Sequence, residues 1–159
     1  MAKRSKAHTE QTINQILDEV LSQLLTLGYG SMSYTTLSDA TGISRTGISH
    51  HFPRKVDFLT RLDPNIARLF IDGLDFSSLT RLESSWMAAL EQPTHAAVLR
   101  LFFSLCGYSG SEITQFRAIS LARETAVSEL GAEGDRLISD LLGRSAVALL
   151  AQTNEAEAA

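Results

Sequence analysis

A short run of small and polar residues, from Arg45 to His50, could bind the edges of DNA bases. Arginine can donate two hydrogen bonds at once to O6 and N7 of a guanine, a contact typically worth ~1–3 kcal/mol of discrimination. Thr46 could contact a thymine methyl group or a phosphate, and Gly47 would let the backbone approach closely. We therefore interpret Arg45, Thr46 and Gly47 as candidate base-reading residues.

Two short predicted helices, joined by a tight turn, would hold this run in place. The first spans Tyr34–Thr41 with Ser33 as its N-cap, and the second spans Arg45–His51 with Ser44 as its N-cap. Gly42 supplies the backbone freedom that the turn requires. Such a helix-turn-helix lays its second helix in the major groove while the first helix crosses the DNA backbone.

The residues before and after the helix-turn-helix extend the pattern. Apolar residues recur at helical spacing from Gln11 to Leu27, which predicts an amphipathic helix with Thr9 as its N-cap and Gly28 as its end. With an aromatic residue, a short polar link and a lysine after the second short helix, residues 9–62 resemble the TetR family. The matching positions are Leu37, Gly42, Ile43, Ser44, Phe52, Lys55, Asp57 and Leu59.

This resemblance assigns roles to individual residues. It implies that Arg45, Thr46 and Gly47 contact bases, in agreement with their residue types. The family usually has an aromatic pair, often tyrosines, where this chain has Ser49 and His51, so histidines could replace the usual tyrosine contact with phosphate. The phosphate-contacting residues that the resemblance implies are Thr35, Ser49, His50, His51 and Lys55.

The charge distribution favours DNA near one end of the chain. The net charge is −4, but residues 1–68 hold eight Lys and Arg against six Asp and Glu, whereas the remaining residues hold six against twelve. A polyanion is attracted to the first part and repelled by the second. The basic residues Lys3, Arg4 and Lys6 form an N-terminal arm that could reach DNA or remain a solvated tail.

Beyond residue 62 the pattern stays helical, and no stretch alternates convincingly with a period of two. A helix from Lys55 either restarts or kinks at Asp63-Pro64, and further helices are expected at residues 79–90 and 94–106. Two final helices are expected at residues 111–130 and 135–150. The sequence therefore predicts an all-α protein, with an N-terminal three-helix DNA-binding domain (residues 1–62) packed on a C-terminal helical domain (residues 63–159).

For this second domain the resemblance implies dimerisation and ligand binding. In the family the last two helices form a four-helix bundle with a second copy, which places the two recognition helices about 34–36 Å apart. The middle helices usually enclose a small-molecule effector, which here would be apolar. Ordinary core packing is the alternative for each candidate lining residue. These candidates are Trp86, Met87, Phe102, Phe103, Tyr108 and Phe116.

Residue types outside the helix-turn-helix argue against an enzyme. The segment from Gly107 to Ser111 nearly matches the G-x-S-x-G nucleophile motif, but it lacks the final glycine and follows a helical pattern rather than a strand. Only His95 could serve there as a base, and no pair of His and Cys residues has the spacing of metal ligands. We expect no enzymatic activity, no cofactor and no metal.

The cysteine and the longest apolar run bear on location. Cys106 has no cysteine partner and is predicted to be a small buried side chain in a reducing compartment. The apolar run at residues 96–106 is interrupted by Arg100 and Ser104 and is shorter than the roughly 20 residues that span a bilayer. No apolar segment follows the basic start, as a signal peptide would require. We expect a cytoplasmic protein without a membrane partner.

These observations predict a sequence-specific DNA-binding transcriptional regulator, a repressor that binds a palindromic operator as a homodimer and is released by a small-molecule effector. The alternative is a DNA-binding adaptor that recruits a protein partner and has no small-molecule effector. An exposed apolar patch outside the dimer interface would favour the adaptor, whereas a closed apolar cavity would favour the ligand sensor.

Overall fold

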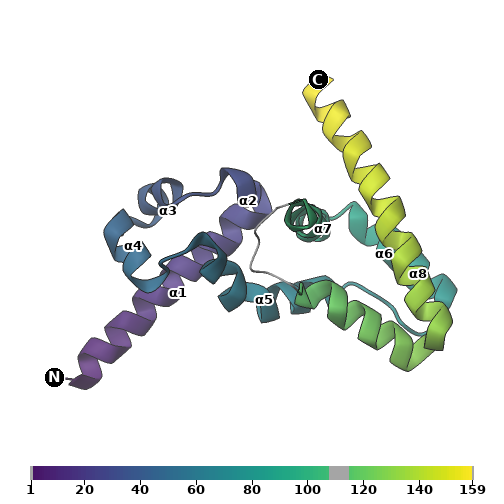
Figure 1. Ribbon diagram of the computed structural model, residues 1–159, viewed down its shortest axis with the longest axis horizontal. Coiled ribbons are helices and arrows are strands. Elements are labelled where there is room, and N and C mark those ends of the chain that lie inside the picture. The colour runs from purple at the N-terminus through teal and green to yellow at the C-terminus, as the bar shows by residue number, and fades with distance from the viewer. Residues whose placement is uncertain (1, 108–114, 159) are drawn as a thin grey trace. The chain divides into compact units, whose positions relative to one another are not determined.

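The computed structural model describes the backbone of residues 2–107 and 115–158, and the side chains of residues 6–107 and 115–152. Across these residues the chain forms helices and no strand, which confirms the predicted all-α class (Figure 1). The chain divides into two compact units, residues 1–62 and 63–159. The helices of the first unit are α1 (Ala2–Thr26), α2 (Gly28–Ser31), α3 (Tyr34–Thr41), α4 (Arg45–His51) and the beginning of α5 (Lys55–Ile71).

The bounds of α3 and α4 agree with the sequence prediction, and so do their caps. Ser33 accepts a hydrogen bond from the Thr36 amide at 3.1 Å, and Ser44 accepts one from the Gly47 amide at 3.1 Å. Gly42 ends α3 with a φ of 73°, in the left-handed region where a side chain would be strained. Local turn chemistry therefore sets the geometry of the helix-turn-helix.

The first helix differs from its prediction at its start. α1 begins at Ala2, so the assignment of Thr9 as an N-cap is wrong, and the residues predicted as an N-terminal arm are part of this helix. The physical reason is that Ala, Lys, Arg and Glu, which make up much of this segment, are good helix formers. Gly28, predicted as the end of the first helix, begins the single helical turn α2.

The core of the first unit lies where α1, α3 and α4 meet the start of α5. Ile16, Val20, Leu37 and Ile48 are fully buried. Leu27, predicted as the last apolar residue of the helix, is 50% exposed because α1 ends one residue before it. Aromatic contacts join the end of the motif to α5: the ring of Phe58 lies 4.8 Å from that of Phe52 and 5.7 Å from that of Tyr34.

The helix α5 continues through Pro64 without a restart. Proline removes one backbone hydrogen bond from a helix interior, which usually breaks or kinks the helix. Here the residues that follow are firmly held, because Ile66, Ala67 and Phe70 are almost completely buried. Tertiary packing thus outweighs the local signal that predicted a possible break.

The second unit is built from the end of α5 and three further helices, α6 (Leu79–Leu90), α7 (Pro93–Cys106) and α8 (Arg117–Ala158), which pack on one another. Its core is centred on Trp86 of α6, whose ring meets Phe70 edge to face at 5.2 Å. The Trp86 indole donates a buried hydrogen bond of 2.9 Å to Ser145 Oγ of α8. A buried polar contact therefore fixes the pairing of α6 with α8.

The long helix α8 consists of two arms that meet at a sharp change of direction (Figure 1). Gly131, with a φ of 70° and a ψ of −156°, makes the break, within the segment where the sequence predicted it. A salt bridge between Arg123 and Asp135, with Nε and Oδ1 2.8 Å apart, links the two arms next to the break. The predicted beginning of the first arm, at Ser111, lies outside the described residues, and the described helix starts at Arg117.

The predicted burial of Cys106 is wrong, because its side chain is exposed. The buried part of α7 is confined to His95–Leu99 and Leu101. Cys106 is the last residue of the helix and lies beyond this buried part. The apolar composition of the run thus overstated how far the core extends.

Candidate nucleic-acid interface

The structure brings the three predicted base-reading residues together in the first turn of α4. Arg45 and Thr46 are exposed, and Arg45 makes no hydrogen bond or ion pair with the part of the chain that is described. One turn later Ile48 is fully buried and anchors the helix from its inner side. A Cβ atom at Gly47 would lie 3.2 Å from both Ile43 Cγ2 and Ser44 Oγ, so a larger residue here would require these side chains to shift by a few tenths of an ångström.

The predicted phosphate-contacting residues around α4 differ in exposure. Thr35, near the start of α3, and His50 are exposed, whereas Ser49 and His51 are half-buried. The Ser49 hydroxyl donates a hydrogen bond of 3.2 Å to the Thr46 carbonyl, and the two histidine rings meet edge to face with their centroids 5.4 Å apart. Thr35 and His50 therefore offer free polar surface, while Ser49 also serves the helix itself.

Lys55, the fifth predicted phosphate contact, has partners within its own unit. Its ammonium group donates hydrogen bonds to the carbonyl oxygens of Tyr29 and Gly30, and it lies 4.4 Å from the centre of the Tyr29 ring. Burial lowers the pKa of this lysine. These contacts tie the start of α5 to α2, a link that the sequence pattern alone did not indicate.

An ion pair forms the link between α4 and α5. The Arg54 guanidinium lies 2.7 Å from Asp57 Oδ1, and the Arg54 amide donates to Asp57 Oδ2 at 2.9 Å. The hydrogen bonds from Arg54 hold the pKa of Asp57 below its ordinary value. Asp57 thus acts as a cap for the start of α5, which explains the acidic residue at this position of the motif.

Gln23 is a residue of the scaffold that the sequence analysis missed. It is 5% exposed, and its amide donates hydrogen bonds to Glu19 at 2.8 Å and to the Thr36 carbonyl at 3.1 Å. The Thr36 hydroxyl in turn donates to Gln23 Oε1 at 2.6 Å. The available signal was a glutamine three residues after Val20, on the apolar face of the first helix.

Replacing Gln23 with alanine is expected to destabilise the first unit by ~1–3 kcal/mol, because the half-buried carbonyl and hydroxyl groups of Thr36 lose a buried partner. Gln15 provides a matched control, since it is a glutamine of the same helix that donates a single exposed hydrogen bond of 3.2 Å to the Thr41 carbonyl. Gln15→Ala should change stability by less than ~0.5 kcal/mol. Urea unfolding followed by circular dichroism measures both, and equal losses would contradict the role given to Gln23.

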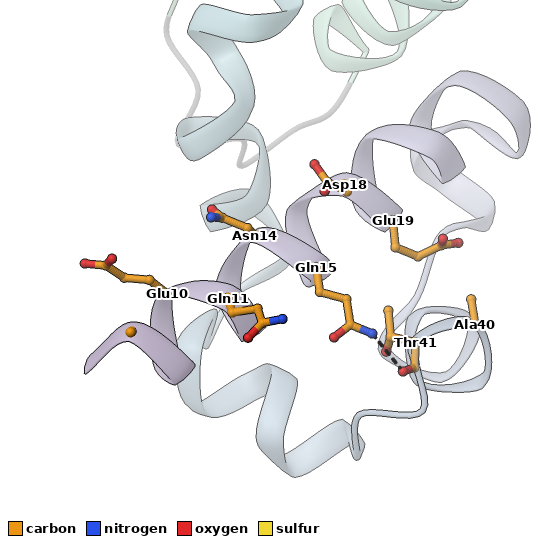
Figure 2. A pocket seen from close by; sticks show the side chains of 9 residues that line it. Glu10, Gln11, Asn14, Gln15, Asp18, Glu19, Ala40 and Thr41 are labelled. Atoms are coloured by element: carbon orange, nitrogen blue, oxygen red, sulfur yellow. Dashed lines mark hydrogen bonds between the residues drawn. The ribbon is translucent and has the colours of Figure 1, made fainter. Parts of the chain in front are cut away.

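An open groove of about 690 Å³ lies between α1 and α3 (Figure 2). Most of the side chains that line it are polar, and they include the carboxylates of Glu10, Asp18 and Glu19. Figure 2 shows Gln15 reaching across it to Thr41. A surface with three carboxylates repels phosphate, in contrast to the first turn of α4, which presents Arg45.

The six predicted effector-pocket residues do not share one environment. Trp86 is 1% exposed and is fully engaged in core packing, and Tyr108 lies outside the described residues. Phe102 forms a small aromatic cluster, with its ring 5.3 Å from Phe103 and 5.9 Å from Phe116. Met87 is half-buried.

A small pocket of about 160 Å³ in the second unit has a polar lining that includes none of these six residues. Asp63, one of its lining residues, accepts a hydrogen bond of 3.1 Å from the Arg117 amide at the start of α8. Burial raises the pKa of Asp63, although the hydrogen bond and the charge of Arg117 act in the opposite direction. The other lining residues are Gln115, Arg117, Ser120, Leu121 and Glu124.

Among the described residues, no helix has the length and apolar composition needed to span a membrane. Within the same residues, no group of three or more His, Cys, Asp and Glu side chains is placed to hold a metal ion.

Comparison with known proteins gives the family. Residues 63–149 match the family described as the tetracycline repressor LuxT C-terminal domain. The chain is also similar to the probable acrEF/envCD operon repressor of Escherichia coli K12 and to that of E. coli O157:H7, with 21% identity over 126 residues in each case. The alignment covers 72% of this chain and 57% of each relative.

These names describe transcription repressors, a class of regulators and not of enzymes. The family match covers more than half of the chain, and the helix-turn-helix geometry of α3 and α4 in the first unit agrees with it. The chain belongs to the TetR family of transcriptional regulators, with a second unit of the LuxT C-terminal type.

Proposed function

We propose that this protein is a transcriptional repressor that binds a palindromic DNA operator as a homodimer. The observation that carries the proposal is the first turn of α4, where Arg45 and Thr46 are exposed on a helix that Ile48 anchors to the core. A rigid helix that presents an arginine without an internal partner fits bidentate recognition of guanine in the major groove. The E. coli relatives are named as operon repressors, which supports repression over activation.

The second arm of α8 offers a surface for dimerisation. Val147 is 72% exposed and Leu150 is 65% exposed, although both are large apolar side chains. Gly143 and Ala146 are exposed on the same face, at spacings of three and four residues. A stripe of apolar and small residues on a well-formed helix fits close packing against the same stripe of a second copy. We call Gly143, Ala146, Val147 and Leu150 the α8 stripe.

We further propose that a small apolar molecule bound in the second unit releases the operator. The cluster of Phe102, Phe103 and Phe116 supports this part, because the half-buried rings of Phe102 and Phe103 offer contact area to such a molecule. An adaptor that recruits a protein partner is the alternative. It is favoured by the exposure of Val127 on the first arm of α8, which is 49% exposed.

The proposed function can be tested by letting the purified protein select binding sites from a pool of random duplex DNA. Wild type should enrich a palindrome, and Arg45→Ala should lose ~1–3 kcal/mol of discrimination at one base pair of each half-site. Arg61→Ala is the matched control, since Arg61 is an exposed arginine of the same unit outside the recognition helix. It should keep the sequence preference of wild type.

The salt dependence separates reading of bases from contact with phosphates. Operator affinity of wild type should fall steeply with salt, and Arg45→Ala should keep most of this slope while losing its preference among sequences. Enrichment of no sequence at any salt concentration would overturn the proposed function. Enrichment that Arg45→Ala leaves unchanged would overturn the role of Arg45 alone.

A further inference from the structure

His95 occupies an unusual place in the second unit. It is a histidine in the first turn of α7, it is only 7% exposed, and its ring stacks on Phe70 of α5 with the centroids 4.8 Å apart. On another side the ring lies against Gly73, where a Cβ atom would come within 3.0 Å of its Cε1 atom. The ring is therefore closely packed between the start of α7 and the end of α5.

The hydrogen bonds of the ring define its protonation state. The backbone carbonyl of Phe70 accepts a hydrogen bond from the ring, while Nε2 has no partner in the described part of the chain. Since Nε2 has no partner there, Nδ1 is the ring atom that can donate to the Phe70 carbonyl, and it would then carry the single proton of the neutral ring. Nε2 is left as a buried acceptor without a donor.

A second proton would have to be placed on this isolated Nε2 atom. The resulting imidazolium would have a buried N–H group without an acceptor, at the N-terminal end of a helix, where the helix dipole disfavours a positive charge. Burial lowers the pKa of His95, and the hydrogen bond to Phe70 offsets only part of that effect. The space is thus built for the neutral ring.

No charged side chain in the described part of the chain contributes to the pKa of His95. The ionisable groups on the segments packed around it are exposed or have partners elsewhere. Arg81 pairs with Asp75, Arg144 pairs with Glu83 and Asp140, and Arg100 bonds to Gln152. Of the others, Asp63 binds the Arg117 amide, Arg68 binds Asn65 and Arg123 binds Asp135. The rest are exposed, namely Asp72, Glu91, Arg117, Glu124, Glu129, Glu133 and Arg136.

We propose that His95 is an acid-sensitive contact between α7 and the last turn of α5, which opens when Nε2 takes up a proton from solvent. Opening exposes the charged ring to water and removes the hydrogen bond that holds the Phe70 carbonyl. The loosened turn belongs to α5, the helix that starts directly after the helix-turn-helix. This inference concerns the second unit and does not depend on DNA binding.

The direction of the pH effect follows from linkage. The folded protein binds this proton less tightly than the unfolded chain does. The contribution of His95 to the free energy of unfolding is therefore fully present above the ordinary histidine pKa of about 6.5. This contribution decreases as the pH falls below that value, until His95 is protonated in the folded protein as well. The opposite trend, a gain of stability on acidification through this range, would overturn the proposal.

The single tryptophan is a built-in reporter of this contact. The Trp86 ring meets the Phe70 ring edge to face at 5.2 Å, and Phe70 also stacks on His95. The other three histidines of the chain lie in the first unit. Between about pH 7.5 and pH 5, wild type should show a change in Trp86 fluorescence and a fall in its thermal midpoint. A flat response of both signals in wild type would overturn the proposal.

Variants assign the response to His95. His95→Phe keeps a ring on Phe70 but cannot be protonated, and His95→Asn keeps a donor for the Phe70 carbonyl, so either variant that folds should lack the response. Asp63→Asn and His51→Asn are controls for the other titratable groups and should retain it. The proposal would be overturned if the pH response persisted in a folded His95→Phe or His95→Asn protein, or if it disappeared in Asp63→Asn. Nitrogen NMR of wild type, which should show the proton on Nδ1 at about pH 7.5, tests the same assignment without any substitution.

Discussion

Replacing Leu150 with aspartate is expected to convert the protein from a dimer to a monomer and to lower its operator affinity by about 10²–10⁴-fold. Leu150 is 65% exposed on the α8 stripe, so the change should leave the isolated fold intact. In a dimer, however, it would place a carboxylate in an apolar contact, where the charge is poorly solvated. Two linked DNA-binding domains bind a palindrome far more tightly than a single domain does, so loss of the dimer removes this gain in affinity.

Size-exclusion chromatography with light scattering measures the oligomeric state, and titration with operator DNA measures the affinity. Val147→Asp, on the same stripe, should act in the same way. Ala132→Asp introduces the same charge at an exposed position next to the break in α8 and should leave a dimer with full affinity. A Leu150→Asp protein that is still a dimer would place the interface elsewhere, and a monomer that keeps full operator affinity would contradict the dimeric mode of binding.

The parts of the fold that the sequence predicted correctly depend on neighbouring residues. Ser33 and Ser44 cap the helices that follow them, and Gly42 and Gly131 adopt left-handed conformations where helices end. Each of these features is decided within a few residues of chain, so residue type and spacing are sufficient to find it. The helix-turn-helix was predictable for this reason.

The features that the sequence did not reveal depend on residues far apart in the chain. Gln23 bonds to Thr36 on another helix, and Lys55 bonds to carbonyl groups of α2. Trp86 of α6 donates a hydrogen bond to Ser145 of α8 in the core. Cys106 is exposed because tertiary packing ends before the apolar pattern does. Spacing shows which residues share a helix face, but it does not show which other helix that face meets.

The break in α8 illustrates both sides of this division and leads to a strong effect on stability. Gly131 was identifiable as a helix end, but Gly134 has a tertiary role that its type alone does not show. A Cβ atom at Gly134 would lie 2.4 Å from the carbonyl oxygen of Ala126 and 2.9 Å from Leu130 Cβ. The two arms of α8 therefore approach so closely that only glycine fits.

Replacing Gly134 with alanine should destabilise the second unit by about 3 kcal/mol or more, because the atoms in the way are largely backbone and cannot rotate aside. Gly143→Ala is the matched control: it changes the same residue type on the same helix, but nothing lies within 4 Å of the added Cβ atom. Since alanine favours helix, this control should gain up to ~1 kcal/mol.

Both variants are best compared in the Leu150→Asp protein, because Gly143 belongs to the α8 stripe and association would otherwise add to the measured stability. Urea unfolding followed by Trp86 fluorescence reports on the second unit, where this tryptophan packs against Phe70 and Ser145. A large loss in Gly134→Ala together with a gain in Gly143→Ala would show that the contact between the arms, and not helix propensity, requires glycine at residue 134. Equal stability of the two variants would mean that the two arms of α8 separate easily. In that case α8 would not be the rigid element that a repressor dimer needs to hold its two DNA-binding domains at a fixed spacing.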